Sequence, residues 1–165
     1  MTIGNERSFL DQLMQLYRAG DLSATDESSG TQMVGIVQQV YLRIVLQDYA
    51  GATELMTADF EMEILGPPEI PLTGCWRGRQ EVAAALERNF SLVEEQVPHL
   101  IGVSAHREAV LVMGRESGRV SATQLPYHVH WVQWFTFRGP LVCRFLQIFD
   151  SEEVDTAFGT SPIKE

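Results

Sequence analysis

Apolar residues recur at helical spacing through the first half of the chain. The clearest stripe, with steps of three to four residues, predicts a helix from residue 33 to about residue 48. Similar spacing predicts helices over residues 6–19 and 80–95 and a short helical piece over 52–56. Serines and acidic residues between 21 and 30 show no strong period and predict a linker. The members of the clearest stripe are Met33, Val34, Val37, Val40, Tyr41, Ile44 and Val45.

The second half instead alternates apolar and polar residues, as strands with one buried face do. Residues 60–64 alternate strictly and predict a strand, and the proline-rich stretch 66–74 predicts a loop. Helices followed by a run of antiparallel strands predict an α+β domain, in which a curved sheet wraps over helices and cups a cavity. The strands expected after Pro98 cover 100–107, 109–116, 124–137 and 141–150, with turns between them that include Ser117-Gly118.

Composition narrows the possible partners. The 165 residues suit one domain of ordinary size. The net charge of −10 repels phosphate backbones and anionic lipids, so we expect neither nucleic acid nor a membrane as partner. The longest apolar stretch, 40–46, contains Arg43 and is far shorter than the ~20 residues that a membrane span needs. The first residues are polar, so no signal peptide is expected.

Few residues favour covalent or cofactor chemistry. Cys75 and Cys143 lie far apart without a CxxC motif, so we expect two small buried residues and a reduced, cytoplasmic setting. Lys164 is the one lysine, and its place in the tail argues against Schiff-base catalysis. The phosphate-loop, dinucleotide, zincin and serine-hydrolase motifs are absent from the sequence, so no cofactor is expected.

Two segments resemble a known family. Residues 72–82, LTGCWRGRQEV, resemble the turn that leads into the third helix of SnoaL-like, ketosteroid-isomerase-related proteins. Residues 131–139, WVQWFTFRG, resemble their long strand and its hairpin. The resemblance covers roughly residues 33–158 and implies the cone-shaped α+β fold of the nuclear-transport-factor-2-like superfamily, with a curved antiparallel sheet over three helices. An extra N-terminal helix and linker (1–30), the SnoaL-like domain (31–160) and a tail (161–165) complete the expected organisation.

The resemblance implies a pocket between the concave face of the sheet and the helices, and commonly a homodimer. It does not imply a reaction, because this fold carries isomerases, cyclases, hydrolases, dehydratases and non-catalytic modules. We aligned the sequence with the pattern of the ketosteroid isomerases. The position of their carboxylate base then corresponds to Ile64, that of their oxyanion acid to Gln133, and that of their tyrosine to Val40, beside Tyr41. An isoleucine cannot abstract a proton, so a typical ketosteroid isomerase is not expected.

The same alignment supplies the expected site residues. Gln133 is expected as the lone strongly polar group among aromatic residues of the long strand, either hydrogen-bonding a ligand or satisfying a group of the core. His130 and Asp48 are weaker catalytic candidates beside Gln133. His128 and His130 on one strand face form half of a metal site, and without a third ligand nearby no metal is expected. The expected ligand-binding residues are Tyr41, Met62, Ile64, Trp76, Trp131, Gln133, Phe135 and Leu146.

Two functions remain open from the sequence. The first is a protein that binds a small apolar molecule in a hydrophobic pocket and works as a cofactor-independent isomerase, cyclase, hydratase or hydrolase if it is an enzyme. The second is a non-catalytic module for dimerisation or regulation, favoured by the loss of polar residues at positions where relatives perform chemistry.

Overall fold

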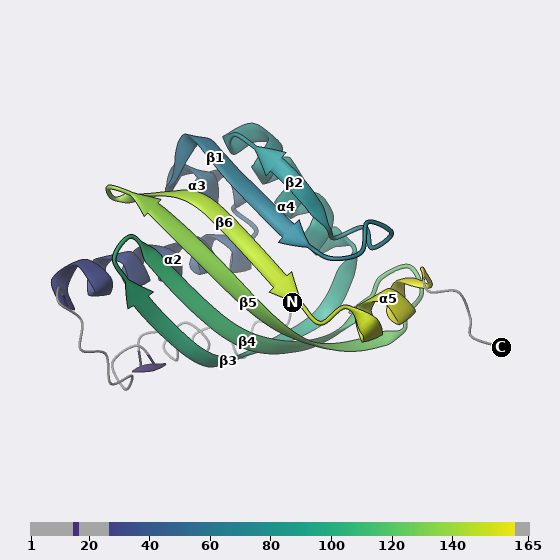
Figure 1. The fold of residues 1–165 in the computed structure, drawn as a ribbon. Coiled ribbons are helices and arrows are strands. Elements are labelled where there is room, and N and C mark those ends of the chain that lie inside the picture. Colours follow the sequence, from purple (N-terminus) through teal and green to yellow (C-terminus); the bar gives the residue numbers. More distant parts are fainter. Residues whose placement is uncertain (1–14, 17–26, 161–165) are drawn as a thin grey trace.

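Six strands form one curved sheet in the order β2-β1-β6-β5-β4-β3 in the computed structural model, which describes residues 15–16 and 27–160. Neighbouring strands run antiparallel except β1 and β6, which run parallel. The α+β fold with a bent, unclosed sheet is therefore confirmed (Figure 1). The strands are β1 (Met56–Leu65), β2 (Gly74–Arg77), β3 (Val93–His106), β4 (Ala109–Val120), β5 (Pro126–Arg138) and β6 (Leu141–Phe149).

The helices α2, α3 and α4 lie together behind the sheet in Figure 1, and α5 follows the last strand. The helix predicted from residue 33 is confirmed, although it begins six residues earlier, where an acid and serines suit a helix start. The helix predicted over 6–19 lies outside the described residues except for 15 and 16. The helices are α2 (Glu27–Val45), α3 (Tyr49–Glu54), α4 (Arg79–Ser91) and α5 (Glu152–Phe158).

The boundary between α4 and β3 differs from the sequence prediction. The helix ends at Ser91 rather than at residue 95, and β3 begins at Val93 rather than at residue 100. Glu95 has a φ of 53°, and the pairing with β4 shifts between Glu94 and Val97. This bulge breaks the alternation that normally identifies a strand, so the first half of β3 carries no period-two signal.

The boundary between β4 and β5 also differs. Ser117-Gly118, predicted as a turn, lies inside β4, which continues to Val120. Gly118 is opposite Tyr127 of β5, and a Cβ at this glycine would lie 2.6 Å from the Tyr127 hydroxyl oxygen. The glycine therefore makes room for a neighbouring ring rather than for a turn.

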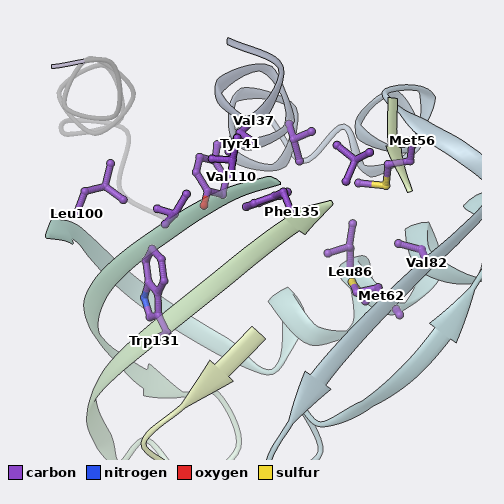
Figure 2. Close-up of a cluster of buried hydrophobic side chains, with 14 of the residues drawn as sticks. Val37, Tyr41, Met56, Met62, Val82, Leu86, Leu100, Val110, Trp131 and Phe135 are labelled. Carbon is purple, nitrogen blue, oxygen red and sulfur yellow. The ribbon is translucent and has the colours of Figure 1, made fainter. Parts of the chain in front are cut away.

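The core lies between α2, α4 and the inner face of the sheet. Figure 2 shows Tyr41 of α2 beside Phe135 of β5, with their ring centroids 5.9 Å apart in an edge-to-face arrangement. Phe145 of β6 continues the cluster, 5.0 Å from the Phe135 centroid. Phe135 is 2% exposed and Phe60 of β1 is fully buried. Tyr41, a member of the apolar stripe predicted from the sequence, therefore packs against β5.

The prediction that both cysteines are buried is wrong. Cys75 is exposed and Cys143 is half-buried. Cys75 lies on β2, a four-residue strand at the edge of the sheet, where no further layer covers the side chain. Within the described helices, none is both long and apolar enough to cross a membrane.

Candidate ligand pocket

A cavity of about 200 Å³ lies between the inner face of the sheet and the helices. Its walls are mostly apolar and come from α2, α4, α5, the loop before β2 and strands β1, β3, β4, β5 and β6. An apolar cavity with a few polar groups is the usual form of a small-molecule site. Six of the side chains expected to contact a ligand line this cavity: Tyr41, Met62, Ile64, Trp131, Gln133 and Phe135.

One polar group in the pocket is a chain of three hydrogen-bonded side chains. The Tyr41 hydroxyl donates to Gln133 Oε1, and Gln133 Nε2 donates to Gln147 Oε1 at 2.9 Å. Gln133 and Gln147 are register partners on β5 and β6, so the pairing of these strands fixes their approach. Among residues 27–160, the Gln147 amide nitrogen has no hydrogen-bond partner. The chain therefore ends in a free N–H donor beside apolar walls.

A second polar group surrounds Glu116 of β4. Its Oε1 accepts from the Tyr127 hydroxyl at 2.7 Å and from Gln96 Nε2 at 3.0 Å. Its Oε2 has no partner among the described residues and is not one of their fully buried polar atoms. Glu116 lines the cavity, and Oε2 is the oxygen of its carboxyl that has no partner within residues 27–160.

Two glycines on either side shape the surroundings of Glu116. Gly114, Glu116 and Gly118 point to one face of β4, and their partners on β5 are Trp131, Val129 and Tyr127. A Cβ at Gly114 would lie 2.3 Å from Trp131 Cζ2, and one at Gly118 would lie 2.8 Å from Tyr127 Cζ. The two rings therefore lie across the glycines and enclose the carboxyl from both sides.

This enclosure changes the acidity of the site. Burial raises the pKa of the Glu116 carboxyl, and the hydrogen bonds from Tyr127 and Gln96 lower it by less. Burial likewise raises the pKa values of the Tyr41 and Tyr127 hydroxyls, so both remain protonated donors. The native state holds the Glu116 proton more tightly than the unfolded chain does. Ionisation of Glu116 therefore removes stability as the pH rises from the ordinary glutamate range through the raised value.

Two residues expected to bind a ligand lie elsewhere. Leu146 of β6 pairs with Trp134 and faces the opposite side of the sheet from its neighbour Gln147. Gln147 lines the pocket where Leu146 was expected, because adjacent residues of a strand face opposite sides of the sheet. Trp76 of β2 pairs with Met62 but does not line the cavity, and the Arg88 guanidinium covers its ring at 5.7 Å.

The two weaker catalytic candidates also lie outside the pocket. His130 is exposed, and its Nδ1 lies 3.1 Å from Asp150 Oδ2 on the outer face of the sheet. The pairing of β4 with β5 is continuous there, so no bulge turns the imidazole inward. Asp48 caps α3 by accepting from the Gly51 amide at 2.9 Å, and it pairs with Arg43. These contacts lower the pKa of the Asp48 carboxyl and fit a structural cap.

Sequence reasoning missed the polarity of the pocket. The expectation of an aromatic cavity with one polar group is wrong, because Gln147, Glu116 and Gln96 line it together with Gln133. The alternation Gly114-x-Glu116-x-Gly118 could have revealed the acid, since it places one carboxylate between two spaces that admit rings. No cluster of three or more histidine, cysteine or acidic side chains suited to a metal occurs within the described residues.

Comparisons with known proteins agree with this architecture. The sequence model of the SnoaL-like domain matches residues 37–145. An NTF2-like protein from Burkholderia xenovorans LB400 is 28% identical, with 78% of this chain and 96% of that chain covered and a TM-score of 0.68. No protein with a curated description matches the chain in sequence.

Two further structures share the fold at lower identity. A proposed SnoaL-like polyketide cyclase from Jannaschia sp. CCS1 is 19% identical, covering 84% of this chain and all of that chain with a TM-score of 0.71. A proposed isomerase from Bacillus subtilis is 18% identical, covering 81% of this chain and 96% of that chain with a TM-score of 0.63.

Proposed function

Because the chain belongs to the SnoaL-like domain family, whose fold encloses a pocket, we propose that it binds a small, mainly apolar molecule between its sheet and helices. The observation that carries the proposal is the free N–H of Gln147 at the end of the Tyr41–Gln133–Gln147 chain. Hydrogen bonds in such a chain polarise one another, which strengthens the last donor. A carbonyl or hydroxyl oxygen of the ligand accepts this hydrogen, and the apolar walls take up the remainder of the molecule.

The proposed reaction class is cofactor-independent isomerisation, cyclisation or hydration. These reactions need a group that moves a proton, and Glu116 supplies a carboxyl that lines an apolar pocket and has one oxygen without a partner within residues 27–160. Ile64, which lies where ketosteroid isomerases hold their base, lines the pocket without a titratable group. The proton would therefore move at β4 rather than at β1, which is not the arrangement of a typical ketosteroid isomerase.

Two probes that differ by one acetyl group test the oxygen site. We expect 4-acetylbiphenyl to bind about tenfold more tightly than biphenyl, because only its carbonyl accepts from Gln147. Gln147→Leu should remove this difference and leave the affinity for biphenyl unchanged. Equilibrium dialysis of both probes measures the ratio.

Gln39→Leu is the matched control for this experiment. Gln39 lies on α2, is exposed and does not line the pocket, so its replacement should preserve the ratio. Equal affinities of the two probes for the unaltered protein would contradict the proposed oxygen site.

A second function, dimerisation, is favoured by the outer face of the sheet. Large apolar side chains there are exposed: Met113 by 41%, Trp134 by 50% and Ile148 by 50%. Met113 and Ile148 both pair with Val132, so the exposed face is continuous from β4 to β6. Monomers rarely expose such a surface, and two copies of a chain with charge −10 associate best where uncharged side chains meet. We assign this face to a second copy of the chain.

Trp134→Glu tests the assignment. We expect the unaltered protein to sediment at twice its 18.5 kDa mass and the variant to sediment as a monomer, because a buried carboxylate has no partner in an apolar interface. Sedimentation velocity measures both masses. Leu125→Glu changes an exposed leucine of the β4–β5 connection and should leave the dimer intact. A monomeric unaltered protein would rule out the dimer.

A further inference from the structure

The pocket has two polar ends rather than one. Gln133 and Val129 lie four residues apart on β5, which corresponds to about 13 Å along the strand. Gln133 belongs to the Tyr41–Gln133–Gln147 chain, and Val129 is the register partner of Glu116. The Trp131 side chain lies between them on the same face and also lines the cavity. A ligand that contacts both ends is therefore longer than a single ring and passes along Trp131.

The two ends offer opposite hydrogen-bonding groups. Gln147 presents a free N–H, so its end needs an acceptor from the ligand. Glu116 presents the free oxygen Oε2 while its Oε1 is fixed by Tyr127 and Gln96. Both hydrogen bonds at Oε1 are donated to the carboxyl and favour its ionised form, which accepts only, so this end takes a donor from the ligand.

We propose that Glu116 Oε2 is a second binding subsite that accepts the hydrogen of a ligand hydroxyl, so that the pocket selects long, flat molecules with a carbonyl at one end and a hydroxyl at the other. The proposal rests on the proposed binding function and adds the class of ligand. The enclosure of Glu116 by Trp131 and Tyr127, seated over Gly114 and Gly118, holds the carboxyl in place before a ligand enters. A fixed acceptor loses little entropy when it binds and gains strength from the apolar surroundings.

A series of three biphenyls separates the two ends. The affinity for biphenyl measures the contribution of the apolar walls. 4-Acetylbiphenyl adds an acceptor for Gln147, and 4-acetyl-4′-hydroxybiphenyl adds a donor for Glu116. We expect the hydroxyl to increase affinity about tenfold over 4-acetylbiphenyl, since hydrogen bonds to charged groups are the stronger class. The methoxy analogue, which cannot donate, should lose this increase without any change to the protein.

Glu116→Gln tests the residue itself. The glutamine oxygen still accepts from Tyr127 and Gln96, but its amide nitrogen faces the pocket as a donor and cannot accept the hydroxyl hydrogen. Because the variant removes a charge whose burial raises the pKa of the group, we expect a melting temperature at pH 7 no lower than that of the unaltered protein. It should lose the tenfold gain from the hydroxyl and keep the gain from the acetyl group.

The outcomes for the two proposals are distinct. A gain from the acetyl group without a gain from the hydroxyl overturns the Glu116 subsite and leaves the proposed function standing. Equal affinity of the hydroxy and methoxy probes, or a full hydroxyl gain in Glu116→Gln, also overturns the subsite. A gain from the hydroxyl that is lost with the methoxy probe and with Glu116→Gln supports it.

Discussion

Phe135→Ala should lower the free energy of unfolding by about 3–5 kcal/mol, the usual cost of truncating a buried phenylalanine. Phe135 is 2% exposed and lies between the Tyr41 and Phe145 rings, so its removal opens a cavity that neither neighbour can fill without moving. Domains of this size are stable by about 5–15 kcal/mol, so the loss is a large share of the total. Urea denaturation followed by circular dichroism measures the change.

Leu125→Ala is the comparison for this variant. Leu125 is 46% exposed in the β4–β5 connection, and its truncation should change the free energy of unfolding by about 0.5 kcal/mol or less. A cost for Phe135→Ala no larger than that of Leu125→Ala would show that the ring cluster is not the core of the fold.

Gly114→Ala should destabilise the protein by about 1–3 kcal/mol, as overpacking of a core usually does. The added Cβ would lie 2.3 Å from Trp131 Cζ2, a distance that forces the indole away from its place over β4. Because Trp131 is both a pocket wall and one of the rings beside Glu116, the affinity for 4-acetyl-4′-hydroxybiphenyl should fall as well. Urea denaturation measures the loss of stability, and equilibrium dialysis of the probe measures the loss of affinity.

Gly35→Ala gives the opposite expectation for the same chemical change. Gly35 lies within α2, and a Cβ there meets nothing within 4 Å. Alanine is favoured over glycine inside a helix by about 1 kcal/mol, so this variant should be more stable. A double variant tests the cause at Gly114: Trp131→Leu should cost less when Gly114 is already alanine. Independent, additive effects would contradict the proposed clash.

The sequence predicted the elements with strong, regular periods and failed at local interruptions of those periods. The stripe from Met33 to Val45 predicted α2, because one helix face must meet the core. The bulge at Glu95 and the pairing of Gly118 with Tyr127 depend on a neighbouring strand that is far away in sequence. Turn propensity alone predicts a turn at a serine followed by a glycine, so the predicted end of β4 lies four residues too early.

The same limitation explains which residues of the candidate site were predicted from the sequence and which were missed. Tyr41 and Gln133 could be placed at the pocket because the resemblance aligned them and both follow a regular element. Glu116 was not placed there, because the predicted strand ended at that residue and an acid at a strand end is usually solvated. The choice of Leu146 in place of Gln147 came from a single position of alignment, to which a strand is most sensitive.

A crystal structure with 4-acetyl-4′-hydroxybiphenyl shows which groups of the pocket its two oxygens contact. We predict that the acetyl oxygen lies about 3 Å from Gln147 Nε2 and the hydroxyl within hydrogen-bonding distance of Glu116 Oε2, with the rings along Trp131. A probe seated on the outer face of the sheet, or one bound in the cavity with neither oxygen near these atoms, would contradict this prediction.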